Sequence, residues 1–324
     1  MFKPAFGLKN RHLQTLYPAF FRKQIQPKTK TEVFELDDGD FVECFWCEKP
    51  PTDDRDIVIL FHGLEGSYKS PYIQGMMNAL QKAGFGSVLM HFRGCSGKQN
   101  RLARAYHSGD TADAKAWIKS LSKRYPKSSL HAVGYSLGGN MLLKLLGEWG
   151  DKSPLKSAVS VSAPMQLDIS ANTINKDFSK FYQKHLLKHL KASLFKKYKS
   201  HPMQTLIGFE EKNIKLIKTF WEFDDIYTAK IHGFSSAKEY YRLSSAKQYL
   251  KSIHTPTLII HAKDDPFMTE EILPKPSEIS PYVKLDIQEH GGHVGFIDGT
   301  VLHPIYWLEE RVVSVLSTAS LHLA

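Results

Sequence analysis

Gly134-Tyr135-Ser136-Leu137-Gly138 decides the fold of this 324-residue chain. The apolar run that leads into it, from Leu130, predicts a strand, and the periodic pattern over 140–149 predicts a helix. A serine between two glycines at a strand–turn–helix junction is typical of a sharp turn that lifts the hydroxyl clear of a sheet. The glycines are needed because a Cβ at either position would crowd the backbone of so tight a turn. We therefore predict that Ser136 is a nucleophile.

Two later segments place a carboxylate and an imidazole after strands, in the chain order serine, acid, histidine. The predicted strand 257–262 is followed by Asp264-Asp265-Pro266, and the predicted strand 283–288 is followed by His290-Gly291-Gly292-His293. Active sites in open α/β sheets gather at the carboxyl ends of the strands. We therefore expect these groups to meet Ser136 at one edge of the sheet.

Each of these two segments offers two candidate residues. Asp265 is the favoured acid because it directly precedes Pro266, and Asp264 is the alternative acid. If Asp265 is the acid, Asp264 would instead bond loop amides. His293 is favoured over His290 because it follows the double glycine. In the predicted roles His293 accepts the Ser136 proton and returns it to the leaving group, and Asp265 orients the imidazole ring.

A third segment offers donors for an oxyanion. The predicted strand 57–61 is followed by His62-Gly63-Leu64. In enzymes with a serine nucleophile on a strand–turn–helix junction, a loop at this position supplies one of the oxyanion donors. We expect the backbone N–H groups of Leu64 and Leu137 to be the donors, the latter at a helix N-terminus.

The remaining pattern alternates strand and helix, which predicts an α/β fold with a mostly parallel sheet and helices on both faces. The pattern from 165 to 250 is helical, which predicts an inserted cap within one domain spanning residues 1–324. Residues 1–30 are expected to form an arm packed on the body, and helices are expected within the insertion at 178–198, 207–220 and 237–250 and at the chain end over 305–316.

The motifs together resemble the α/β-hydrolase superfamily and, more narrowly, its YheT-like branch, which includes lipid hydrolases of the ABHD1 and ABHD3 type. That resemblance implies hydrolysis of short- to medium-chain esters or lipid esters through an acyl-enzyme. The motifs that carry the resemblance extend over nearly the whole chain and occur in the same order as in the family. The segments that carry it are 11–18, 62–67, 92–97, 106–110, 134–138, 223–229, 264–267 and 291–296.

Composition limits the partners and the compartment. No apolar stretch approaches the ~20 residues of a membrane span, and the N-terminus lacks the pattern of a secretory signal. Three cysteines, Cys44, Cys47 and Cys95, favour reduced thiols in a cytoplasmic protein. The Cys44-Phe45-Trp46-Cys47 spacing is not interpreted as a redox or zinc site, because residues three apart on a strand face opposite ways. We expect no metal and no cofactor.

The net charge of +10 is concentrated in a predicted helix with lysines at 176, 180, 184, 188, 191, 196, 197 and 199. Phe178, Tyr182, Leu186 and Leu190 recur among them at helical spacing. A solvated outer face of the cap is the favoured interpretation, and weak docking on anionic membrane is the alternative. No nucleic-acid motif accompanies the charge, so we expect no nucleic-acid partner.

Three functions are compatible with these residues. The favoured one is a serine carboxylic ester hydrolase acting on a small-molecule or lipid ester. An alcohol acyltransferase would use the same triad with a different acceptor. A catalytically silent hydrolase fold acting as a binding or membrane-associated module is the third, and the complete set of Ser136, Asp265 and His293 argues against it.

Overall fold

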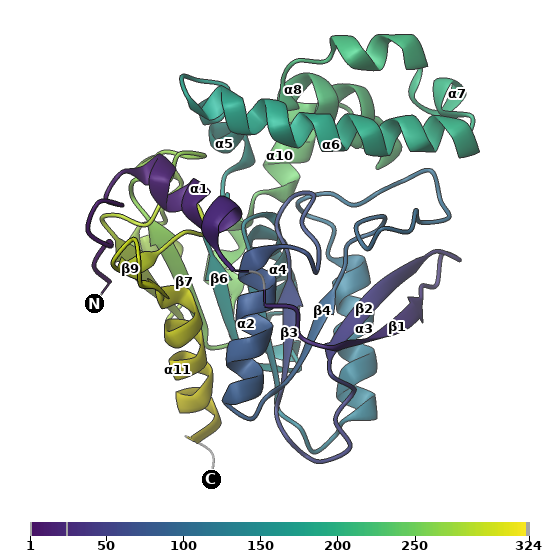
Figure 1. Cartoon of the computed structure of the whole chain (residues 1–324). Helices are drawn as coiled ribbons and strands as arrows, with labels where there is room; N and C mark the ends of the chain where they lie inside the picture. Colours follow the sequence, from purple (N-terminus) through teal and green to yellow (C-terminus); the bar gives the residue numbers. More distant parts are fainter. Residues whose placement is uncertain (1, 24, 322–324) are drawn as a thin grey trace.

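The computed structural model describes residues 2–23 and 25–321. It is built on an eight-stranded sheet in the order β1-β2-β4-β3-β5-β6-β7-β8 (Figure 1). β2 runs antiparallel to β1 and β4, and the other neighbouring pairs are parallel. The strands are β1 Thr29–Glu35, β2 Phe41–Cys47, β3 Ile57–Phe61, β4 Gly86–Met90, β5 Leu130–Tyr135, β6 Leu155–Val161, β7 Thr257–Ala262 and β8 Val283–Gln288. The predicted mostly parallel α/β fold is confirmed.

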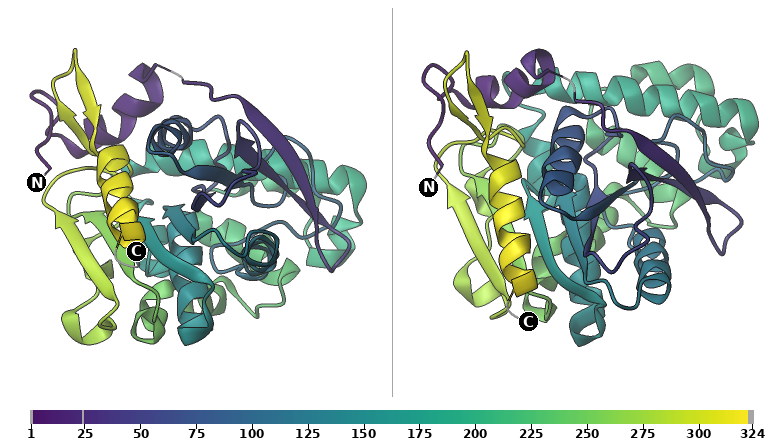
Figure 2. Two further views of the ribbon diagram at one scale, coloured as in Figure 1. Left: turned by 90° about the horizontal axis from the view of Figure 1, so that it is seen from below. Right: turned by 60° about the horizontal axis from the view of Figure 1, so that its bottom comes forward.

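Two hydrophobic layers sandwich this sheet. Ile57, Ile59 and Phe61 of β3 pack in one layer, and Val58 and Leu60 pack in the other. This follows from the period of two along a strand, and both faces are apolar because helices cover both. The first layer includes residues of α3 (Ala112–Arg124) and α4 (Leu137–Trp149), and the second includes residues of α2 (Pro71–Lys82) and α11 (Trp307–Leu321) (Figure 2).

The segment between β6 and β7 is helical, as the sequence pattern over 165–250 predicts. Figure 1 shows this segment lying across one end of the sheet. Its longest member is α6, Ser179–Ser200, of 22 residues. The others are α5 Leu167–Thr173, α7 Met203–Ile207, η2 Glu211–Leu216, α8 Phe220–Phe223, η3 Asp224–Thr228, α9 Ala229–Ile231, α10 Ala237–Ser244 and η4 Ala246–Ser252. Within the described part of the chain, no helix is long and apolar enough to cross a membrane.

Three predicted helices differ from the structure. The α-helix expected over 207–220 does not form: α7 ends at Ile207 because Gly208 takes a left-handed φ of 65°, and the short η2 is the helical segment between it and α8. The helix expected over 237–250 ends at Ser244 and continues as η4. The last helix begins at Trp307 instead of 305, because β10, Pro304–Tyr306, first pairs with β9, Ile297–Gly299.

The N-terminal arm contains a helix that the sequence pattern did not predict, α1, Arg11–Phe21. Asn10 caps it, because its side chain accepts hydrogen bonds from the N–H groups of His12 and Leu13. The expected single domain over 1–324, with 165–250 as its insertion, includes residues 1, 24 and 322–324, which lie outside the described residues. That division stays a prediction.

Candidate active site

Ser136 occupies the turn between β5 and α4, with φ 50° and ψ −117°. This backbone conformation is rare for a residue with a side chain, and the turn is held by close packing on both sides. A Cβ on Gly134 would lie 2.4 Å from the carbonyl oxygen of Gly138, and a Cβ on Gly138 would lie 2.5 Å from that of His62. The two glycines are therefore required by contact with backbone atoms.

Gly138→Ala should lower the free energy of unfolding by about 1–3 kcal/mol, because the new methyl group must displace the backbone at the end of β3. Urea denaturation of the variant and of the wild type measures this difference. Gly86→Ala is the matched control: its Cβ would lie no nearer than 3.4 Å to another residue, so its effect should stay within about 0.5 kcal/mol. Equal effects of the two substitutions would contradict the expected clash.

The predicted triad residues lie together beyond the carboxyl ends of β5, β7 and β8, at one edge of the sheet. The Oγ of Ser136 lies 2.9 Å from Nε2 of His293, and Nδ1 of His293 lies 2.8 Å from Oδ2 of Asp265. Asp265 is 1% exposed, and its Oδ1 accepts a hydrogen bond from the N–H of Phe267. If Nδ1–H donates to Asp265, Nε2 is left as the acceptor for the Ser136 hydroxyl.

The two alternative residues form a separate pair. Asp264 Oδ2 lies 3.2 Å from Nδ1 of His290, and its Oδ1 accepts a hydrogen bond of 2.9 Å from the N–H of Gly292. Asp264 therefore bonds a loop amide, which is the role expected of it if Asp265 is the acid. The geometry brings Asp265 and His293 to Ser136, and it brings Asp264 and His290 to each other.

The two predicted oxyanion donors belong to residues beside the serine. Leu137 is the first residue of α4, where backbone N–H groups lack helical partners. Leu64 follows Gly63, whose Cβ, if present, would lie 3.2 Å from Cβ of Ser136. Leu64, Leu137 and Ser136 line one cavity.

The loop that carries Leu64 is held by three side chains. His62 Nε2 accepts a hydrogen bond from the N–H of Phe92, so His62 Nδ1–H donates to the Gly63 carbonyl at 2.7 Å. That carbonyl shares a planar peptide group with the Leu64 N–H, so its bond fixes the plane of the donor. Tyr72 and Tyr106 hydroxyls accept hydrogen bonds from the N–H groups of Gly63 and Glu65. The sequence analysis predicted neither tyrosine as a support of this loop, although Tyr106 begins the segment 106–110 that carries the family resemblance.

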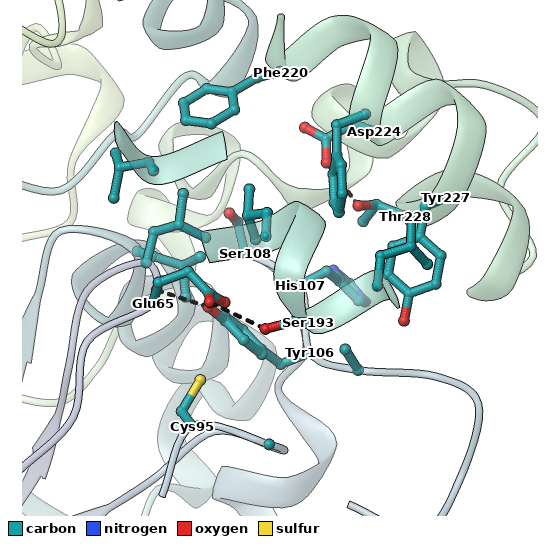
Figure 3. Close-up of a pocket in the computed structure, with 18 of the residues that line it drawn as sticks. Glu65, Cys95, Tyr106, His107, Ser108, Ser193, Phe220, Asp224, Tyr227 and Thr228 are labelled. Carbon is teal, nitrogen blue, oxygen red and sulfur yellow. Dashed lines mark hydrogen bonds between the residues drawn. The ribbon is translucent and has the colours of Figure 1, made fainter. Parts of the chain in front are cut away.

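The cavity that Ser136 lines lies between the loops after β3 and β4 and the inserted helices. Figure 3 shows Glu65 and Cys95 on one side of it and Phe220 and Asp224 on the other. Apolar side chains of α5, with the residue after it, and of α6 and α8 form one part of its wall: Leu167, Ala171, Ile174, Leu186, Leu190, Leu194, Phe220 and Phe223. Charged residues also line it: the cations Arg93, Lys196 and Lys197 and the carboxyl groups of Glu65 and Asp224. Burial raises the pKa of Glu65, which accepts hydrogen bonds from Tyr106 and Ser193, and burial raises the pKa of Asp224 to about 6. The cavity can therefore enclose a largely apolar group beside the serine.

One group of side chains in the described residues has the composition of a metal site. Ligand atoms of His107, Asp110 and His232 lie within 4.8 Å of one another. However, the Asp110 carboxylate is paired with the Arg104 guanidinium, and Nδ1 of His232 lies 2.8 Å from the carbonyl oxygen of Thr228. Nε2 of His232 lies 3.3 Å from the carbonyl oxygen of Ala105, which joins the inserted segment to the loop before α3, and we assign no metal to this group.

Comparisons with known proteins agree with this architecture. A sequence profile of the alpha/beta hydrolase fold matches residues 56–300. The chain is 46% identical to "Putative esterase YheT" of Escherichia coli (strain K12), over 98% of this chain and 93% of that protein. It is 27% identical to "Phospholipase ABHD3" of Mus musculus, over 88% of this chain and 71% of that protein. The solved structure of the Pyrococcus furiosus esterase Pf2001 has the same fold, with a TM-score of 0.57, 18% identity and coverage of 90% and 93%.

Proposed function

Because this chain belongs to the α/β-hydrolase family, in its YheT-like branch, we propose that it hydrolyses carboxylic esters through an acyl-enzyme on Ser136. The observation that carries the proposal is His293, which lies within hydrogen-bond distance of both the Ser136 hydroxyl and the Asp265 carboxylate. An isolated serine hydroxyl is a weak nucleophile, and an adjacent base oriented by a third group activates it. The names of the relatives, an esterase and a phospholipase, agree with this reaction class.

In the first half of the reaction Ser136 Oγ attacks the ester carbonyl while Nε2 of His293 accepts the hydroxyl proton. The carbonyl oxygen becomes negative, and the N–H groups of Leu64 and Leu137 stabilise it. Asp265 stabilises the imidazolium that forms. When the carbon–oxygen bond to the alcohol breaks, His293 gives the proton to the departing alkoxide, and the acyl group remains on Ser136.

In the second half a water molecule replaces the alcohol. His293 accepts a proton from this water as its oxygen attacks the acyl carbonyl, and then returns the proton to Ser136 Oγ as the carboxylic acid leaves. The apolar wall from α5, α6 and α8 suits an acyl chain or another apolar part of the ester. We propose that the inserted helices over 165–250 act as the cap that covers this group.

Product analysis tests the proposed reaction. Wild-type protein incubated with a series of short- to medium-chain esters should release one equivalent of acid for each equivalent of alcohol. Added ethanol should yield little ethyl ester if water is the acceptor. If ethyl ester is the main product, the activity is acyl transfer to an alcohol and not hydrolysis. If folded protein releases no alcohol from any of the esters, the chain is better described as a binding module.

We also propose the cytoplasm as the compartment. Cys44, Cys47 and Cys95 are free thiols, as a reducing compartment would keep them. Cys44 and Cys47 pack in the two different core layers, so the strand between them keeps the thiols on opposite faces of the sheet. Fractionation of cells that express the chain, with the protein found outside the cytosolic and membrane-bound fractions, would contradict this compartment.

A further inference from the structure

Helix α6 has two unlike sides. Its inner side contributes Leu186, Leu190 and Leu194 to the cavity wall. Its outer side exposes Lys180, Lys184 and Lys188. The 22-residue helix contains seven lysines and neither Asp nor Glu, although the exposed Asp177 stands just before it. One helix therefore separates the cavity from a strongly basic surface, and it lies across the top of the molecule in Figure 1.

Aromatic side chains are exposed at the start of this basic surface. Phe178 is 51% exposed and Phe181 is 54% exposed, and their ring centroids lie 6.0 Å apart. The sequence pattern placed Phe178 in the apolar stripe with Tyr182. The structure buries Tyr182 but leaves Phe178 half-exposed, because Phe178 precedes the first turn of α6. The ring of Phe178 contacts His12 of α1, with centroids 4.5 Å apart. Leu13, the next residue of α1, is 46% exposed.

A series of ring contacts joins these exposed side chains to His293. The ring centroids of Phe178 and Tyr182 are 5.9 Å apart, and those of Tyr182 and Phe267 are 5.0 Å apart. Phe267 then stacks on the imidazole of His293, with centroids 4.0 Å apart and an interplanar angle of 13°. The exposed aromatic pair therefore lies at the outer end of the packing that supports the proposed catalytic base.

We propose that Phe178, Phe181, Lys180, Lys184 and Lys188, called here the α6 face, dock on the surface of an anionic lipid membrane. The lysines complement the negative lipid headgroups, and the aromatic rings suit the boundary between headgroups and acyl chains. Docking itself does not depend on the enzymatic activity. Its consequence, delivery of an ester dissolved in the membrane to a cavity on the other side of the same helix, rests on the proposed function.

Charge favours a membrane over a second copy of the chain. In a symmetric dimer the same patch of both copies would meet itself, so the lysines of one α6 face would oppose those of the other. Like charges brought together in this way repel. An anionic surface instead gains from each lysine, and it can also accommodate the two phenylalanine rings.

Sedimentation with lipid vesicles tests the docking, with Ser136→Ala protein as the base so that turnover cannot alter the lipid. The full-length protein should pellet with vesicles of equal parts phosphatidylglycerol and phosphatidylcholine, and much less with phosphatidylcholine alone. Each lysine near an anionic surface raises partitioning about fivefold, so Lys180→Glu, Lys184→Glu and Lys188→Glu together should lower it at least about 100-fold. Phe178→Ser with Phe181→Ser should also lower it clearly.

The matched control reverses three other exposed lysines, Lys119→Glu, Lys123→Glu and Lys127→Glu, on and just after α3. This control has the same net charge as the α6 variant, and the elements that carry it lie away from α6 in Figure 1. It should retain most of the binding. Equal losses in the two triple variants would assign the binding to net charge and would overturn the proposal, as would a Phe178→Ser, Phe181→Ser variant that binds like the parent.

Two further outcomes also overturn the α6 face as a lipid-docking surface. One is absence of vesicle binding together with a dimer in light scattering that the two phenylalanine substitutions abolish. The other is binding of duplex DNA in place of vesicles. In the active protein, the triple α6 variant should turn over a vesicle-embedded ester more slowly and a water-soluble short ester at the normal rate. Loss of both activities would instead indicate a defect at Ser136 or in folding.

Discussion

Replacement of Ser136 by alanine should lower kcat for ester hydrolysis by about 10,000-fold or more, because removal of the nucleophile leaves only the oxyanion donors and substrate binding to act. The variant should still fold. Alanine keeps the Cβ that the turn already accommodates at φ 50°, and it loses the hydrogen bond of the hydroxyl to His293. Steady-state kinetics on a water-soluble ester, with circular dichroism to verify folding, provide the measurement.

A fluorophosphonate gives an independent readout of the same residue. Wild-type protein should gain the mass of one phosphonyl group, and Ser136→Ala protein should gain none. Ser120→Ala, on α3 and outside the cavity, is the matched serine control and should react like the wild type. Turnover or labelling that survives in the Ser136→Ala protein would mean that another residue is the nucleophile.

Asp265→Asn should also lower kcat by about 10,000-fold, whereas Asp264→Asn should lower it by less than about tenfold. A carboxylate bonded to Nδ1–H holds the tautomer of His293 in which Nε2 can accept the serine proton. An amide can donate to Nδ1 and so favours the other tautomer, which is the reason that such substitutions cost about this much in serine hydrolases. KM should change little in both variants, because neither aspartate lines the cavity.

Asp264→Asn is a close control, because the two residues are neighbours and the change is identical. Asp264 contacts His290 and the Gly292 amide, so its substitution should affect the conformation of the loop before His293 and the stability more than the chemistry. The measurement is kcat and KM for both variants on one ester, with the urea midpoint of each. A larger loss of kcat in Asp264→Asn than in Asp265→Asn would reverse the assignment of the acid.

The sheet could be predicted from the chain because its strands carry strong local signals. β3, β5, β7 and β8 begin and end at the predicted residues, since β3, β5 and β7 are short, mostly apolar runs and β8 alternates apolar and polar residues. The insertion was harder to predict. Gly208 ends α7 at the point where the apolar pattern predicts that a helix begins. Helix α1 forms because Asn10 caps it and because Gln14 donates a hydrogen bond to the carbonyl of Ile297, 283 residues away in the chain.

By itself the sequence determined the candidate nucleophile and the fold class, because the glycines, the apolar runs and the helix pattern around Ser136 all act within about twenty residues. Only the tertiary structure decided which of two adjacent aspartates meets His293, since neighbouring side chains leave the backbone in different directions and the partner arrives from another strand. It also decided that Tyr182 is buried while Phe178 and Phe181 face outward. Burial depends on which elements pack against a helix, and that is a property of the whole fold.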